Sequence, residues 1–127
     1  MNMPYLAPPV GSLVTLIAYG VDMQLLNDQQ RLTEIFLEAL RADNFKILKT
    51  LAHSFEPVGF TLVAIIAESH ATLHTYPEYK TLIFSLYTCR GPQDGEVAVE
   101  HLKTGVQPRH IAVYRQPIAV KNEGFTE

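Results

Sequence analysis

One stretch of the chain concentrates side chains that can act as nucleophiles, acids and bases. It is Glu68-Ser69-His70-Ala71-Thr72-Leu73-His74-Thr75-Tyr76-Pro77-Glu78-Tyr79, and the only cysteine, Cys89, lies 20 positions after Ser69. A hydroxyl or a thiol becomes reactive when a histidine or a carboxylate lies within hydrogen-bond reach. Taken alone, each residue has an ordinary explanation, since a lone cysteine in an apolar run is usually a small buried hydrophobe. The combination of these residues is therefore the informative feature.

The two histidines of this stretch do not predict a metal centre. His70 and His74 have the spacing of a His-x-x-x-His motif, but the glutamate of the zinc-protease motif is absent and the chain has no Cys-x-x-Cys pair. We expect no bound metal.

The stretch closely resembles the self-cleavage site of prokaryotic S-adenosylmethionine decarboxylases of the short, pyruvoyl-dependent type. The resemblance covers most of the chain, including residues 11–22, 53–55, 68–79 and 88–89. In that family the serine after the glutamate becomes an N-terminal pyruvoyl group when the backbone cleaves itself. The resemblance implies cleavage between Glu68 and Ser69, which would give fragments 1–68 and 69–127.

Self-cleavage defines roles for several residues. The Ser69 hydroxyl would attack the Glu68 carbonyl carbon, the amide would rearrange to an ester, and a base would then remove the Ser69 α-hydrogen. By resemblance, His74 matches the processing base, and Thr61 matches a serine whose hydroxyl assists the reaction. The backbone around Ser69 must be distorted for this attack.

The same resemblance assigns the decarboxylation site. The pyruvoyl group derived from Ser69 would form a Schiff base with the substrate amine and serve as the electron sink. Cys89 matches the proton donor to the substrate. Phe55 matches an aromatic residue that stacks on adenine, Tyr76 stands where tryptophan is common, and Glu78 matches the acid that contacts the ribose hydroxyls.

The activity implied by the resemblance is decarboxylation of S-adenosylmethionine for spermidine biosynthesis, by a homodimer whose active sites are shared between subunits. The covalently bound pyruvoyl group is the only cofactor expected. Four positions depart from the family pattern: Thr61-Leu62 stands where Ser-Gly is usual, and Lys80 and Arg90 each stand where glycine is usual.

These departures leave two alternatives open. The first is a pyruvoyl-dependent arginine or ornithine decarboxylase, in which Glu56, Glu78 or Asp22 would receive the basic group of the substrate. The second is an unprocessed, non-catalytic regulatory paralogue.

Hydrophobic patterning predicts the elements that hold these residues. Apolar residues at spacings of three and four after Asn27 and Asp28 predict a helix up to Ala42, and a second helix is expected from Glu96 to about residue 105. Short runs rich in β-branched and aromatic residues predict strands at 12–19, 46–55, 60–67, 70–75, 81–88 and 110–114. The order predicts an α+β fold, a two-layer sandwich of an antiparallel sheet with two helices packed on one face, and residues 1–10 are expected to form an irregular arm.

Composition limits the remaining function classes. With 127 residues, 47% hydrophobic content and a net charge of −3, the chain is expected to form a single domain over residues 1–127 with no positive field for nucleic acid. The most apolar run, residues 60–67, is too short to span a membrane, and the N-terminus does not resemble a signal peptide. We therefore expect a cytoplasmic protein that binds neither membrane nor nucleic acid.

Overall fold

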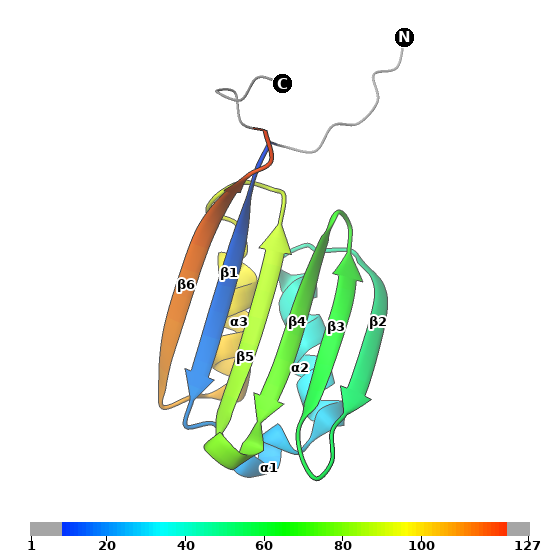
Figure 1. Cartoon of the computed structure of the whole chain (residues 1–127), viewed down its shortest axis with the longest axis vertical. Coiled ribbons are helices and arrows are strands. Elements are labelled where there is room, and N and C mark those ends of the chain that lie inside the picture. The colour runs from blue at the N-terminus through cyan, green and yellow to red at the C-terminus, as the bar shows by residue number, and fades with distance from the viewer. Residues whose placement is uncertain (1–8, 122–127) are drawn as a thin grey trace.

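The computed structural model describes residues 9–121, which form a six-stranded antiparallel sheet with helices on one face (Figure 1). The strand order across the sheet is β2-β3-β4-β5-β1-β6. The strands are β1 (Val10–Tyr19), β2 (Ile47–Ser54), β3 (Phe60–Ile66), β4 (Ser69–Tyr76), β5 (Thr81–Thr88) and β6 (His110–Ala119). The predicted α+β class and the antiparallel sheet are confirmed.

Two longer helices and two short ones accompany the sheet. They are α1 (Met23–Leu26), α2 (Gln29–Ala42), the 3-10 turn η1 (Pro77–Tyr79) and α3 (Glu96–Val106). Helix α2 begins where the sequence predicted, because the Asp28 side chain accepts a hydrogen bond from the Arg31 backbone and caps the helix. Within residues 9–121, none of the helices has the length and apolar character needed to cross a bilayer.

The hydrophobic core lies between the helices and the sheet. The apolar stripe of α2 buries Leu32, Phe36 and Leu40, and β5 contributes Phe84. The rings of Phe36 and Phe84 meet edge to face, with their centroids 6.0 Å apart. Burial of a side chain of this size stabilises the fold by about 2–3 kcal/mol, so this layer fixes the helices against the sheet.

The other face of the sheet is not covered by any helix of residues 9–121 (Figure 1). Along β4, Ala71 and Leu73 are fully buried toward the helices, whereas His74 alternates with them and points to the opposite side. We call this uncovered side the open face. Several large apolar side chains on it are exposed, among them Leu51 at 72% and Tyr114 at 62%.

The structure differs from the expected elements in several places. Helix α1 was not predicted, because a single turn capped by Asp22 is too short to show a periodic pattern. Strand β6 runs to Ala119 rather than ending near Tyr114, and it passes through Pro117 because an edge strand tolerates proline on its unpaired side. The irregular arm was expected at residues 1–10, and this is wrong at Val10, where pairing with Ala119 of β6 makes it the first residue of β1. Residues 1–8 lie outside the described residues.

Candidate active site

The predicted cleavage point lies at a sharp hairpin. Strand β3 ends at Ile66, β4 begins at Ser69, and these two residues pair directly across the turn formed by Ala67 and Glu68. Glu68 has φ of 61°, in the left-handed region that non-glycine residues seldom occupy. Such a conformation costs about 1–2 kcal/mol, so strain is stored in the residue whose carbonyl Ser69 would attack.

Three predicted residues meet at this hairpin. The Ser69 hydroxyl donates to the Cys89 sulfur over 4.0 Å, and the Cys89 thiol donates to Oε2 of Glu68 over 3.5 Å. Cys89 follows directly after β5, where the pairing of β4 with β5 brings it alongside Ser69. It is only 7% exposed. The structure thus places a shielded thiol beside the peptide bond predicted to break.

The predicted processing pair lies elsewhere on the sheet. Thr61 and His74 are direct cross-strand neighbours on the open face, and a hydrogen bond of 2.5 Å joins the Thr61 hydroxyl to Nδ1 of His74. His74 is five residues along β4 from Ser69, which corresponds to about 16 Å at the usual rise of a strand. Within one chain, His74 therefore cannot reach the Ser69 α-hydrogen.

The predicted substrate-binding residues gather around His74. A cavity of about 280 Å³ is lined by Phe55, His74, Tyr76 and Glu78, together with the turn that joins β2 to β3. The His74 ring lies 4.6 Å from the Tyr76 ring and 5.8 Å from the Phe55 ring, measured between centroids. Phe55 and Tyr76 are 43% and 38% exposed, so their aromatic faces are available to a flat ligand.

The three acidic residues considered for a basic substrate separate in the structure. Glu56 and Glu78 both line the cavity around His74. Asp22 instead caps helix α1, where its side chain accepts from the Gln24 backbone, and it lines a different cavity with Lys80 and Arg109. Only Glu56 and Glu78 are therefore placed to meet a ligand bound against Phe55.

The glycine-to-lysine departure at position 80 has a structural explanation. Lys80 ends the 3-10 turn with φ of 51°, a left-handed conformation that glycine adopts without cost. Its carbonyl accepts a hydrogen bond from the Val21 backbone, which holds the residue in this conformation. The lysine therefore adds local strain of about 1 kcal/mol relative to a glycine in the same conformation.

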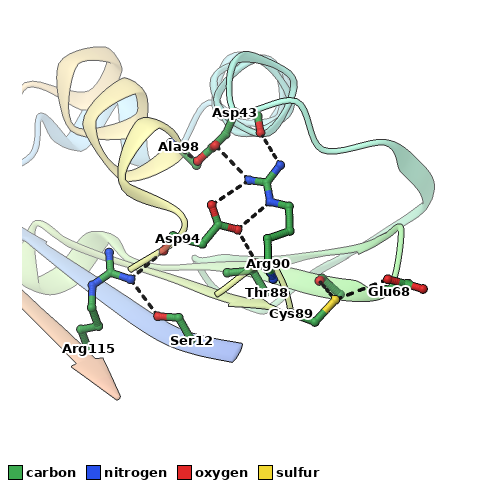
Figure 2. Close-up of polar contacts among 10 residues, drawn as sticks. Ser12, Asp43, Glu68, Thr88, Cys89, Arg90, Asp94, Ala98 and Arg115 are labelled. Carbon is green, nitrogen blue, oxygen red and sulfur yellow. Dashed lines mark hydrogen bonds and ion pairs between the residues drawn. The ribbon is translucent and has the colours of Figure 1, made fainter. Parts of the chain in front are cut away.

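The other departure, Arg90, is the centre of a polar network that the sequence did not predict (Figure 2). Its guanidinium donates to both carboxylate oxygens of Asp94, at 2.6 and 3.1 Å, and to the side chain and the backbone carbonyl of Asp43, at 2.9 and 2.8 Å. The only sequence signal was the unusual residue after Cys89. Asp43 is 47 positions away from Arg90, so no local pattern could have identified it.

The network shifts the protonation of its members. Burial opposes the charge of Arg90, but hydrogen bonds and charges from Asp94 and Asp43 outweigh it, so the pKa of Arg90 is raised. Burial likewise raises the pKa of Asp94, but hydrogen bonds from Arg90, Thr88 and the Gly95 backbone, with the charge of Arg90, lower it overall. Both groups are thus held in their charged forms.

Among residues 9–121, no cluster of three or more possible metal ligands occurs.

Comparisons with known proteins identify the family of the chain and a related fold. The sequence profile of the S-adenosylmethionine decarboxylase family matches residues 13–117. The S-adenosylmethionine decarboxylase proenzyme of Pyrococcus abyssi is 32% identical over 119 residues, covering 92% of this chain and 86% of that protein. The proenzyme of Brevibacillus brevis is 34% identical over 98 residues, covering 77% and 74%. The crystal structure of the adenosylmethionine decarboxylase from Aquifex aeolicus has the same fold, with a TM-score of 0.82 at 24% identity, covering 95% of this chain and 100% of that one.

Proposed function

This chain belongs to the S-adenosylmethionine decarboxylase family, and from that premise we propose that it is a proenzyme that cleaves itself between Glu68 and Ser69 and then decarboxylates S-adenosylmethionine. The product would supply spermidine biosynthesis. The observation that carries the proposal is the meeting of Ser69, Cys89 and the strained Glu68 at one hairpin. The mature protein would consist of fragments 1–68 and 69–127.

The cleavage uses only groups of the chain itself. The Ser69 Oγ forms a bond to the Glu68 carbonyl carbon, and the bond from that carbon to the Ser69 nitrogen breaks as the nitrogen takes up a proton. A base then removes the Ser69 α-hydrogen, and the Glu68 carboxylate leaves with its electron pair. The dehydroalanine that remains is hydrolysed to the pyruvoyl group with release of ammonia. The left-handed conformation of Glu68 favours this sequence, because breaking the peptide relieves its strain.

The base is proposed to come from a second copy of the chain. His74 and its hydrogen-bond partner Thr61 lie about 16 Å from Ser69 of the same chain, on the open face. A homodimer that joins two open faces would bury exposed apolar side chains such as Leu51, Ile65 and Tyr114. It would also bring the His74 cavity of one subunit against the Ser69 hairpin of its partner, giving two shared active sites by symmetry.

The cavity around His74 fits the substrate in chemical character. Phe55 and Tyr76 present aromatic faces for adenine, each stack contributing on the order of 1 kcal/mol, and Glu78 offers a carboxylate to the ribose hydroxyls. The residues at the Ser69 hairpin also fit a pyruvoyl group, since Cys89 provides a shielded thiol beside it. The pyruvoyl group would supply an electron sink when the bond to the substrate carboxylate breaks. Cys89 would hold the proton that replaces the lost carboxylate.

Intact-mass measurement of purified protein tests the proposal most directly. We expect two fragments whose masses correspond to 1–68 and to 69–127 with a pyruvoyl end. A single uncleaved chain in material that nevertheless decarboxylates S-adenosylmethionine would disprove the pyruvoyl mechanism. An uncleaved and inactive chain would instead support the regulatory paralogue.

A second candidate substrate is retained because Glu56 and Glu78 both line the cavity. Two carboxylates could receive the guanidinium of arginine or the ammonium of ornithine. Carbon dioxide release should be measured separately with S-adenosylmethionine, arginine and ornithine. Release from S-adenosylmethionine alone supports the proposal, whereas release from either amino acid alone would identify the chain as a basic amino acid decarboxylase.

A further inference from the structure

The two residues that flank Cys89 are bound to the same carboxylate. Before it in the chain, the Thr88 hydroxyl donates to Oδ2 of Asp94. After it, Nε of Arg90 donates to the same oxygen over 2.6 Å, and the Arg90 backbone N–H donates to the Thr88 hydroxyl over 3.0 Å. The backbone on both sides of the cysteine is therefore closed into one hydrogen-bonded ring, as Figure 2 shows.

Arg90 extends this ring to the helical layer. Its guanidinium is bound by the side chain and the carbonyl of Asp43, the residue that ends helix α2, and its carbon atom Cζ lies 3.7 Å from the centroid of the Phe45 ring. The second carboxylate oxygen of Asp43 accepts from the Ala98 backbone over 2.9 Å, in the first turn of α3. Asp43 is only 9% exposed. The Cys89 loop is thus fixed to both long helices through one side chain.

Strand β6 adds a further restraint on Asp94. Arg115 donates to the Asp94 carbonyl over 2.6 Å and to the Ser12 hydroxyl over 2.7 Å. Ser12 is the register partner of Thr88 on the neighbouring strand β1. The backbone of Asp94 is therefore held by Arg115, while its carboxylate is held by Arg90 and Thr88.

We propose that Arg90 is a positioning residue for Cys89, acting by joining Asp94 and Asp43 across the loop so that the thiol is held beside Ser69 and Glu68. The catalytic consequence rests on the proposed function, in which Cys89 delivers a proton to the substrate. A guanidinium suits this role because it offers several donors in one rigid plane and stacks on an aromatic ring. A lysine ammonium is a single point charge that cannot bind both carboxylates and Phe45 in the same way.

The first experiment measures thiol access in a protein that cannot cleave. In a Ser69→Ala background, Cys89 is the only cysteine, so its alkylation by iodoacetamide can be followed by mass without interference. Rates are compared at the high-pH plateau, where the thiol is fully ionised, and well below the unfolding temperature of the least stable variant. When Arg90→Ala is added to the Ser69→Ala background, we expect the alkylation rate to rise by about tenfold. We expect Arg90→Lys to restore little of the protection of Cys89 against alkylation.

The matched control is Arg31→Ala in the same background. Arg31 also forms an ion pair, with Glu34 at 3.3 Å, but both side chains are about half exposed and lie on α2 away from the loop. We expect its alkylation rate to equal that of the parent. An unchanged rate in Arg90→Ala would overturn the proposal. If Arg90→Ala does not fold, Asp43→Asn removes the negative charge that faces Arg90 and one of the two carboxylate acceptors. It should still raise the alkylation rate by about threefold, and an unchanged rate there would also overturn the proposal.

The second experiment uses the cleaved wild-type enzyme and its Arg90→Ala variant. A displaced proton donor should lower kcat by about tenfold and leave KM within about twofold, because Arg90 contacts none of the residues that line the substrate cavity, which the proposed dimer takes from the partner subunit. Equal kcat values would overturn the positioning role. If wild-type protein neither cleaves nor decarboxylates, the proposed function fails, while the alkylation result still tests whether Arg90 holds the thiol.

Discussion

The two ends of strand β4 are built in different ways. At the Ser69 end, the Cys89 thiol is almost fully buried, and an ionic network from the sheet and both long helices holds the residues beside it. At the Tyr76 end, His74 is bonded to Thr61 and otherwise faces aromatic rings that are about two-fifths exposed. The network that positions Cys89 is completed within a single chain, whereas the Tyr76 end presents an open surface.

This difference separates the chemistry into two requirements. Proton delivery needs a donor held in one position, which a network of charge-assisted hydrogen bonds provides. The substrate site and the processing base that we propose at the Tyr76 end need access to a second molecule, which an open aromatic surface allows. The comparison therefore predicts that changes at the Ser69 end act within one subunit, and that changes at the Tyr76 end act across the proposed dimer.

Replacement of the nucleophile should have the largest effect. Ser69→Ala removes the only hydroxyl at the hairpin turn and should abolish cleavage completely, leaving one full-length species in the mass spectrum. Ser54→Ala is the matched control, since that hydroxyl bonds the Gln29 side chain at 2.8 Å near the opposite end of the sheet. Cleavage of the Ser69→Ala chain at the same bond would contradict the assignment of the nucleophile.

A complementation experiment tests which subunit supplies the base. His74→Ala alone and Ser69→Ala alone should both remain uncleaved. When the two are co-expressed with tags of different mass, the His74→Ala chain should be cleaved, because its intact Ser69 meets the His74 of its Ser69→Ala partner. Absence of cleavage in a confirmed mixed dimer would contradict sharing of the active site and would require His74 to act by another route.

Loss of an aromatic face should have a smaller effect, confined to binding. Tyr76→Ala removes one ring of the cavity and should raise KM for S-adenosylmethionine by about tenfold. This is the expected loss when an aromatic stacking contact of about 1 kcal/mol disappears together with the apolar area that the ring buries. Tyr79→Ala is the matched control, since Tyr79 is 75% exposed and does not line that cavity. Equal KM values for the two variants would place the substrate elsewhere.

Much of this arrangement could be predicted from the sequence. The contacts that could not be predicted have identifiable physical reasons. Alternation along residues 70–75 predicted the strand, and the Asp28 cap with its apolar stripe predicted α2. The residues of both ends were named by their resemblance to a family. Periodicity states which face a side chain occupies, but it does not state how far Ser69 lies from His74 or that Asp43 meets Arg90 across 47 positions. Those contacts depend on tertiary packing.

The ionic network also predicts a modest pH dependence at its own end of the sheet. Burial raises the pKa of Asp94, but hydrogen bonds from Arg90, Thr88 and the Gly95 backbone lower it overall, so the unfolded chain binds this proton more readily than the folded one. The stabilisation of the folded state by the charged Asp94 is therefore fully present above the ordinary aspartate pKa, about 3.9. It is lost as the pH falls through the lower pKa of Asp94 in the folded state.

The ion pair between Arg90 and Asp94 is partly exposed and contributes about 1 kcal/mol. Over this pH range, the unfolding free energy of wild type should therefore fall by about 1 kcal/mol more than that of an Asp94→Asn variant. Denaturant unfolding at a series of pH values measures the difference. Glu34→Gln provides the matched control, because its ion pair with Arg31 is exposed and should leave the pH profile parallel to that of wild type. Parallel profiles for wild type and Asp94→Asn would mean that the network does not stabilise the charged carboxylate. The Ser69 end of β4 would then be held by packing alone, and charge would no longer explain why it differs from the Tyr76 end.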